Sequence, residues 1–404
     1  MFLDFFLPFY DDFLDKVPSK IRKILGLILF SIGTVLIISM NIPYLLVGII
    51  LTLVGVVTFF HNSLNSVPLW DEESNENGIE KKIIGNTGLE VTTIGMGGAP
   101  LGNLGEKTAR ETLEKSYELG INYFDTAPLY GAGNSEKHYG RFLPEIDRES
   151  FVISSKVGRL ILSEEEAKHH YSNDMVTPAI ETNLKASSYK NNVVFNFSRE
   201  GVLRSIEESL ERLSIDNLDI VYIHDPDDNY EIALNETLPT LLELKSKGVI
   251  KAIGAGMNEW EMLLDFAKNG EFDCFLLAGR YTLLDYSALD LLLPKCIEKD
   301  ISVIIGGPYN SGILASDLNE KSTYFYQPSP KEVINKAKKI KIICDKYKVP
   351  LKSAALQFGL NHNSVASTIP GPRSPEEVIN NLEMLSFEID PNLWEELRKN
   401  KLIP

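Results

Sequence analysis

Four ionisable side chains stand at or just after the ends of three apolar runs in the chain. Asp125 and Tyr130 lie in the segment FDTAPLYGAGNSE, Lys156 ends the run FVISSK, and His224 ends the run LDIVYIH. Taken singly, each has a structural explanation, because an aspartate after a strand often caps a turn and an isolated histidine is often packed. If the three runs are neighbouring strands of one parallel barrel, their ends meet and the four side chains lie together.

A phenol, an ammonium, a carboxylate and an imidazole in one place can move a proton. Tyrosine has an ordinary pKa of about 10, so it is a poor base at neutral pH. We expect the ammonium of Lys156 to lower the pKa of Tyr130, and we expect Asp125 to hold that ammonium in place. Tyr130 then exchanges a proton with a carbonyl or alcohol oxygen that His224 orients by a hydrogen bond. The set predicts hydride transfer between a carbonyl–alcohol pair and a nicotinamide.

The elements that must position these residues repeat along the chain from residue 81 onward. Short apolar runs typical of strands alternate with segments of helical periodicity, which predicts the α/β class and a (β/α)8 (TIM) barrel. A hairpin is expected around residues 86–88. The polar segment 159–198 is expected to be an irregular insertion that acts as a lid or substrate loop. The expected strands are 93–96, 121–125, 151–156, 218–224, 250–256, 272–278, 301–306 and 364–369.

A doubly wound dinucleotide-binding sheet is the competing fold. The glycine-rich stretch GMGGAPLG follows the first expected strand, and Asp125 ends the second, where that fold places its ribose-binding acid. However, Pro100 occupies the last position of the glycine pattern, and no helix start follows closely. The barrel is therefore the favoured prediction.

Composition excludes some classes of function. The chain has 404 residues, of which 44% are hydrophobic and 24% charged, and its formal net charge of −16 argues against nucleic-acid binding. The cysteines Cys274, Cys296 and Cys344 are scattered and have no spacing typical of a metal site. They are predicted to be reduced cytosolic thiols that pack in the core, and no metal ligands are predicted.

Two uncharged apolar runs precede the barrel. Residues 24–40 and 44–60 each give roughly 25 Å of helix, close to the hydrocarbon thickness of a bilayer, and Asn41 and Pro43 break them. A buried core hairpin and a signal peptide are the alternatives, but the preferred prediction is a transmembrane hairpin. Four basic residues before the first run place the N-terminus, and hence the barrel, on the cytoplasmic side.

The predicted organisation therefore has four parts. Residues 1–23 form a cytosolic or interfacial segment, 24–60 a two-helix membrane hairpin, 61–80 a linker and 81–404 the barrel. The expected localisation is membrane-anchored, with the catalytic part facing the cytoplasm and the hairpin contacting lipid.

The segments FDTAPLYG, VISSKVGR and VYIHDPDD resemble the Asp–Tyr–Lys–His tetrad of the aldo-keto reductases, and the resemblance extends over residues 82–385. LAGRYTLLD and IGAGMNEWEML are similar to the aldose 1-dehydrogenase branch, which includes L-fucose and D-threo-aldose dehydrogenases. The resemblance implies an NAD(P)-dependent oxidoreductase that oxidises the C1 hydroxyl of an aldose to a lactone. Asp125, Tyr130, Lys156 and His224 are the implied catalytic residues.

The resemblance also implies a binding site for NAD or NADP. GGPYNSGIL (306–314) is similar to a pyrophosphate-binding loop, and IPGPRSPEEVINNLEML (369–385) to a segment that binds the adenosine end. Tyr281 stands where an aromatic ring stacks on the nicotinamide. The implied cofactor residues are Asn258, Tyr281, Gly307, Pro308, Tyr309, Asn310, Gly312, Leu314, Gly371, Arg373, Ser374 and Asn381.

Some positions depart from the family pattern. Gly256 and Met257 replace the usual Ser-Asn pair, and Ala278 replaces a glutamine. Glu377 stands where NADP-preferring members often carry arginine, whereas the guanidinium of Arg373 suits a phosphate. Use of both cofactors with modest discrimination is therefore expected.

The sequence leaves two other functions open. The same tetrad run in reverse gives a general aldehyde or ketone reductase. Potassium-channel β subunits keep this fold and its cofactor while serving a membrane partner, and this chain carries an expected membrane hairpin. An aldose or aldehyde is the expected small-molecule partner in either enzymatic case.

Overall fold

The structure, a computed structural model, describes residues 78–163, 165–166 and 192–404. Its centre is a parallel sheet with the strand order β14-β11-β10-β9-β8-β5-β4-β3. A parallel bridge between Ile94 and Thr368 joins the two edges, and Gly95 N–H donates to Thr368 O at 2.9 Å, so the sheet closes into a barrel. The strands are β3 (Met96–Gly97), β4 (Tyr123–Asp125), β5 (Val152–Val157), β8 (Ile220–His224), β9 (Ala252–Met257), β10 (Cys274–Ala278), β11 (Ser302–Gly306) and β14 (Val365–Ile369).

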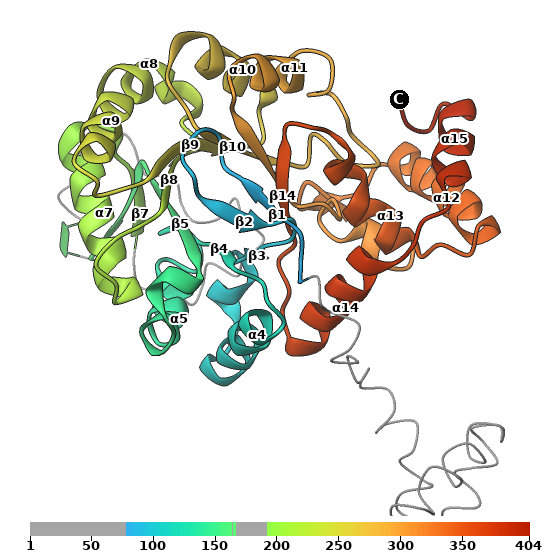
Figure 1. The fold of residues 1–404 in the computed structure, drawn as a ribbon, viewed down its shortest axis with the longest axis horizontal. Coiled ribbons are helices and arrows are strands. Elements are labelled where there is room, and N and C mark those ends of the chain that lie inside the picture. Colours follow the sequence, from blue (N-terminus) through green and yellow to red (C-terminus); the bar gives the residue numbers. More distant parts are fainter. Residues whose placement is uncertain (1–77, 164, 167–191) are drawn as a thin grey trace, which may run out of the picture. The chain divides into compact units, whose positions relative to one another are not determined.

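Helices surround the barrel (Figure 1). Their local sequences explain their limits: α7 begins after Ser198, whose side chain accepts from Gly201 N, and ends at Ser214 in the left-handed conformation. Val202, Ile206 and Leu213 give α7 its buried face. The helices are α4 (Glu106–Glu118), α5 (Asn134–Gly140), α7 (Arg199–Leu213), α8 (Tyr230–Ile232), a π-helical segment (Ala233–Thr237), α9 (Leu238–Ser246), α10 (Trp260–Asn269), α11 (Leu292–Glu298), α12 (Lys331–Lys346), α13 (Leu351–Phe358), α14 (Pro375–Ser386) and α15 (Pro391–Lys399).

A β-hairpin covers the end of the barrel at which the strands begin (Figure 1). It consists of β1 (Lys81–Ile83) and β2 (Glu90–Thr92), and Ile84, Leu89 and Val91 belong to the same buried cluster as side chains of the barrel strands. The expected hairpin around residues 86–88 is thus confirmed. Because this end is filled, the chemistry has to lie at the other end, where the strands finish.

The insertion after β5 differs from its prediction at both ends. β6 (Arg159–Leu162) pairs with β7 (Asn192–Phe195) in antiparallel fashion, and Leu160, Leu162 and Val194 form a small core of their own. The alternation of buried and half-buried residues in RLIL explains why this polar segment still begins with a strand. The expectation of irregular structure over all of 159–198 is wrong for these ends, and residues 164 and 167–191 lie outside the description.

The barrel prediction is confirmed, and the doubly wound alternative is wrong because the sheet has no open edges. All three cysteines are buried free thiols, as expected. Across residues 78–163, 165–166 and 192–404, no helix has the length and apolarity needed to cross a membrane. The predicted hairpin (24–60) and the segment before it (1–23) lie outside the described residues, as does most of the linker.

Candidate active site

Asp125 and Lys156 form a buried ion pair at the C-terminal ends of neighbouring strands. Asp125 is the last residue of β4 and is paired with Ser154 of β5 in the sheet. Lys156 lies two positions after Ser154 in β5. Lys156 Nζ donates to Asp125 Oδ1 at 2.7 Å, to Oδ2 at 2.8 Å and to Thr126 O at 2.8 Å. Ser154 Oγ donates to Asp125 Oδ1 at 2.7 Å. The side chains of the pair are only 1% and 2% exposed, so each charge depends on the other.

Tyr130 and His224 complete the cluster. Lys156 Nζ lies 5.0 Å from the ring centroid of Tyr130. The Tyr130 and His224 rings meet edge to face at 5.9 Å and 87°. His224 ends β8, the strand that pairs with β5, which brings it beside Lys156. The four residues expected from three separate segments therefore gather at one place.

The pKa of Tyr130 contradicts the expectation from sequence. Removal of the phenol from water raises the pKa of Tyr130 well above its usual value, and the negative charge of Asp125 raises it further. The lowering expected from Lys156 does not prevail over burial, and the amine of Lys156 is engaged by both oxygens of Asp125. Tyr130 is thus a phenol at neutral pH. As a phenol it can act as a general acid, and it can act as a general base only after it has lost its proton.

His224 is a neutral imidazole. Burial lowers the pKa of His224 well below its usual value, and the positive charges of Arg159 and Lys156 lower it further. His224 Nδ1 is buried and has no hydrogen-bond partner among the described residues. A neutral ring can donate or accept one hydrogen bond at a nearby oxygen without adding charge.

A cleft of about 480 Å³ runs from this cluster along the ends of the strands. Asp125 and Tyr130 line one part of it, and Arg373 and Glu377 line another; Lys156 and His224 are not among its lining residues. Seven of the twelve expected cofactor residues line the cleft: Gly307, Pro308, Tyr309, Gly312, Gly371, Arg373 and Asn381.

The other five, Asn258, Tyr281, Asn310, Leu314 and Ser374, do not line it. The ring of Tyr281 packs against Phe358 at 5.2 Å and is nearly buried, so the structure does not offer it for stacking in the cleft. Ser374 caps α14 by accepting from Glu377 N. Asn258 offers its carbonyl oxygen to Arg280 Nε at 3.2 Å. The side chains of Tyr281 and Ser374 are thus used in packing and capping, roles that a motif in the sequence does not distinguish from ligand contact.

The cleft fits a nicotinamide dinucleotide. Gly307 has a φ of +59°, and a Cβ at that position would meet no neighbour within 4 Å, so a side chain would extend into open space at the cleft. The positive φ favours glycine at this position, and the lack of a side chain keeps the cleft open. Tyr309 Oη donates to Asn381 Oδ1 at 2.8 Å, which joins the two segments expected to hold the cofactor.

Arg373 and Glu377 are paired with each other at the cleft. Arg373 Nη2 lies 2.6 Å from Glu377 Oε1, and Arg373 N–H donates to Glu377 Oε2 at 2.8 Å. The pair holds the pKa of Glu377 below its usual range despite partial burial, so the carboxylate is ionised. The guanidinium is 69% exposed, and an exposed pair of this kind adds at most about 1 kcal/mol.

Sequence reasoning missed a hairpin that reaches the cleft. β12 (Thr323–Tyr324) and β13 (Gln327–Pro328) are joined by Phe325 and Tyr326, both with positive φ (+46° and +60°). Tyr326 lines the cleft, and its N–H donates to Ser311 Oγ at 3.1 Å. The guanidinium of Arg280 lies 4.2 Å over the Phe325 ring. The run TYFY in a polar stretch was the available signal.

The barrel is closed and carries Asp, Tyr, Lys and His at its strand ends, beside a cleft. This arrangement is typical of an oxidoreductase that acts on carbonyl and alcohol groups. Residues 93–401 match the aldo/keto reductase family. The chain belongs to this family, and it is an NAD(P)-dependent oxidoreductase acting on CH–OH or carbonyl groups.

The chain is similar to other proteins over nearly the whole length of those proteins. The chain is 37% identical to pyridoxal 4-dehydrogenase of Microbacterium luteolum over 342 residues, covering 80% of this chain and 98% of the relative. It is 36% identical to D-threo-aldose 1-dehydrogenase of a Pseudomonas species over 326 residues, covering 78% and 96%. A solved aldo-keto reductase of Bacillus halodurans in its holo form has the same fold, with a TM-score of 0.63 at 24% identity, covering 81% of this chain and 97% of that one.

Proposed function

We propose that the protein oxidises the C1 hydroxyl of an aldose to a lactone, with Asp125, Tyr130, Lys156 and His224 as the catalytic set. The observation that carries the proposal is the buried Asp125–Lys156 pair, whose ammonium faces the Tyr130 ring at 5.0 Å, with His224 edge-on to that ring. The 36% identity to a D-threo-aldose 1-dehydrogenase supports the choice of substrate.

The bound nicotinamide supplies the hydride acceptor in this reaction. The C1–H bond breaks and its electron pair leaves with the hydrogen. The proton of the C1 hydroxyl goes to the phenolate oxygen of Tyr130, which has first lost its own proton to water, and C1 becomes the carbonyl carbon of the lactone. His224, which is neutral, hydrogen-bonds the reacting oxygen and orients it. Asp125 holds Lys156 in place beneath the Tyr130 ring. Gly307, Tyr309, Gly371 and Asn381 would hold the cofactor in the cleft.

Reduction of an aldehyde is the second candidate. The observation that favours it is the raised pKa of Tyr130, because a phenol is ready to donate a proton to a carbonyl oxygen at neutral pH. The 37% identity to a pyridoxal 4-dehydrogenase adds aromatic aldehydes to the substrates to be tried. Both candidates use the same four residues, and they differ in direction.

We further propose that both NAD and NADP bind and that NAD is modestly preferred. A 2′-phosphate would meet the ionised Glu377, which repels it, and Arg373 must leave Glu377 before it can bind the phosphate. Because the exposed pair is weak, that change costs little. We also retain the proposal that residues 24–60 anchor the barrel to the cytoplasmic face of a membrane.

One experiment separates these candidates. Initial rates are measured with a panel of aldoses and NAD+ or NADP+, and with aliphatic and aromatic aldehydes and NADH or NADPH. The proposed function predicts the highest kcat/KM for an aldose in the oxidative direction. Turnover of aldehydes alone would replace it by the second candidate, and no turnover in either direction, with cofactor bound, would favour a binding subunit.

A further inference from the structure

Arg159 and Asp225 form a second ion pair directly beside the proposed catalytic residues. Arg159, the first residue of β6, lies three positions after Lys156, and Asp225 follows His224. Arg159 Nη2 lies 3.2 Å from Asp225 Oδ2, and His224 Nε2 lies 3.5 Å from the same oxygen. The pair thus adjoins the ring proposed to orient the reacting oxygen.

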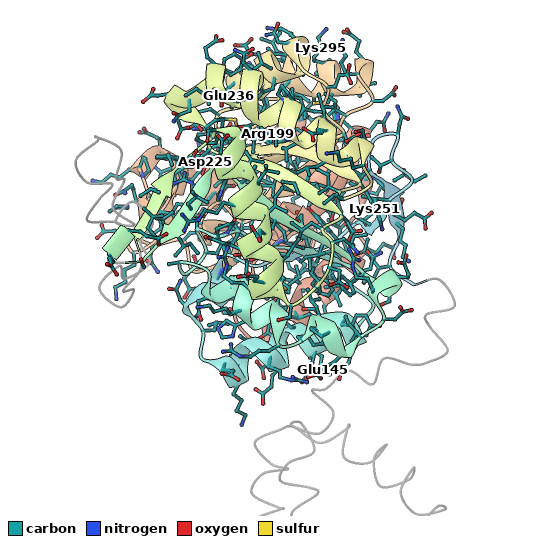
Figure 2. All side chains as sticks on the ribbon, turned by 90° about the vertical axis from the view of Figure 1, so that its left-hand side faces the viewer. Glu145, Arg199, Asp225, Glu236, Lys251 and Lys295 are labelled. Carbon is teal, nitrogen blue, oxygen red and sulfur yellow. The ribbon has the colours of Figure 1, made fainter. Side chains whose placement is uncertain are left out.

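The pair lies at the catalytic end of the barrel. In the side view of Figure 2, Asp225 lies on one side of the domain and Lys251, which precedes β9, lies on the opposite side. The side chains of Arg159 and Asp225 are 13% and 24% exposed, so both are mostly shielded from water but still reachable.

Both members of the pair are held in fixed positions. The guanidinium of Arg159 lies 4.4 Å over the ring of Phe195, which comes from β7. Asp225 has a φ of +40°, a conformation that costs a non-glycine residue free energy, and its N–H donates to Gly256 O at 3.0 Å. Strain of this kind persists only where the surroundings enforce it, and it concentrates at functional sites.

Arg159 and its neighbour His224 each have a nitrogen atom that makes no hydrogen bond to any described residue. Within the described part of the chain, Arg159 Nε and His224 Nδ1 are both buried and have no hydrogen-bond partner. Buried polar atoms are nearly always paired, and these two lie beside the place proposed for the reacting oxygen, where a polar ligand would pair them. The charges of Arg159 and Asp225 also act on Tyr130, whose pKa the first lowers and the second raises.

The chemistry of the pair selects the kind of ligand. A hydroxyl group both accepts and donates, so it can take a hydrogen bond from the guanidinium and give one to the carboxylate. A phosphate or carboxylate would be repelled by Asp225 and attracted by Arg159, with no net gain. Neighbouring oxygens of a sugar are separated by about one hydrogen-bond length, which matches the closeness of His224 and Asp225.

We propose that Arg159 and Asp225 recognise the hydroxyl group next to the reacting carbon, the C2 hydroxyl of an aldose, and so select polyhydroxylated substrates over simple aldehydes. This inference rests on the proposed function, because it takes the reacting oxygen of an aldose to lie at Tyr130 and His224.

The test compares an aldose with its 2-deoxy and 3-deoxy analogues in the full-length wild type and in Arg159→Gln and Asp225→Asn. A hydrogen bond to a charged group changes kcat/KM by roughly 10- to 100-fold. The wild type should therefore lose about that factor on the 2-deoxy sugar, and each variant should lose far less. The loss on the 3-deoxy sugar should be equal in all three proteins. Because the comparison is a double-mutant cycle, effects on folding or on Tyr130 cancel.

Arg148→Gln is the matched control. Arg148 also lies over a phenylalanine (Phe151, 4.8 Å) and pairs with an aspartate (Asp219, 2.8 Å), but it precedes β5 and so belongs to the other end of the barrel. This variant should keep the wild-type penalty for the 2-deoxy sugar. If Arg159→Gln yields no folded protein, Arg159→Lys replaces it, because lysine keeps the charge but loses the flat guanidinium.

The outcomes separate this inference from the proposed function. If the wild type oxidises aldoses and Arg159→Gln keeps the full 2-deoxy penalty, the pair does not contact the C2 hydroxyl and only this inference is overturned. If the wild type turns over no aldose, the inference and the proposed function are overturned together.

Discussion

Lys156 donates to both carboxylate oxygens of Asp125, at 2.7 and 2.8 Å, while Ser154 donates to one of the same oxygens from within the barrel. The pair is inaccessible to water, so each charge is stabilised by the other and by these hydrogen bonds. The arrangement holds the amine of Lys156 under the Tyr130 ring, 5.0 Å from its centroid, with both oxygens of Asp125 beside it. It explains how the site can hold a lysine in a buried place and still leave Tyr130 protonated.

Replacing Asp125 by asparagine should therefore affect both stability and rate. The variant leaves the Lys156 ammonium buried without a counter-charge, which costs roughly 3–5 kcal/mol in the free energy of unfolding. Urea unfolding and kcat measured on the same preparation would show the two losses. Glu145→Gln, which breaks an exposed pair with Arg110, is the control and should change neither. A variant as stable as the wild type would contradict the conclusion that the buried Lys156 depends on Asp125.

The direction of the reaction should determine its pH dependence. Oxidation needs the phenolate of Tyr130, and because the pKa of Tyr130 is raised well above 10, the reactive fraction grows about tenfold per pH unit below that pKa. The rate of sugar oxidation should therefore rise steadily from pH 7 to pH 9. Aldehyde reduction uses the phenol and should be flat over the same range. A plateau of the oxidation rate below pH 8 would contradict the raised pKa.

Cofactor choice should respond to the Arg373–Glu377 pair. Glu377→Arg removes the repulsion and adds a second cation, so the ratio of kcat/KM for NADP+ to that for NAD+ should rise by at least about tenfold. Arg373→Ala leaves Glu377 unpaired and should shift the ratio toward NAD. Glu376→Arg, on the exposed neighbour that does not line the cleft, is the control. Equal ratios in all four proteins would place the adenosine ribose elsewhere.

The membrane hairpin makes a separate prediction. The full chain should remain with membranes after carbonate extraction, because residues 24–60 contain two uncharged apolar runs. A chain beginning at Gly78, where the compact barrel unit starts, should be released and keep the wild-type kcat. Release of the full chain by carbonate would show that the hairpin is not in the bilayer.

The barrel strands could be predicted from sequence because they are buried on both faces and thus form continuous apolar runs. The expected strand 301–306 and the observed Ser302–Gly306 differ by one residue. The first strand was predicted less accurately. Residues 93–95 make only isolated hydrogen bonds to β14, and regular pairing with β4 begins at Met96. Short strands carry few residues with which to show a pattern.

The site was predictable where an ionisable residue ends an apolar run, as for Asp125 and Lys156, because the end of a strand places that residue at the end of the barrel. Pairings that depend on three-dimensional context were not. The packing of Tyr281 against Phe358 and the pairing of Arg159 with Asp225 join segments far apart in the chain. Tyr326 was missed because a turn with two aromatic residues at positive φ lacks the glycine or asparagine by which such turns are recognised.

The most direct test of the catalytic proposal is Tyr130→Phe. The substitution keeps the ring that faces Lys156 and His224 and removes only the hydroxyl that would carry the proton. We predict that kcat falls by at least about 100-fold in both directions, as for loss of a general acid–base group, while the Kd for the cofactor, measured by fluorescence quenching, stays within error of the wild type. Turnover close to the wild-type rate would contradict the assignment of Tyr130 as the proton carrier and with it the mechanism.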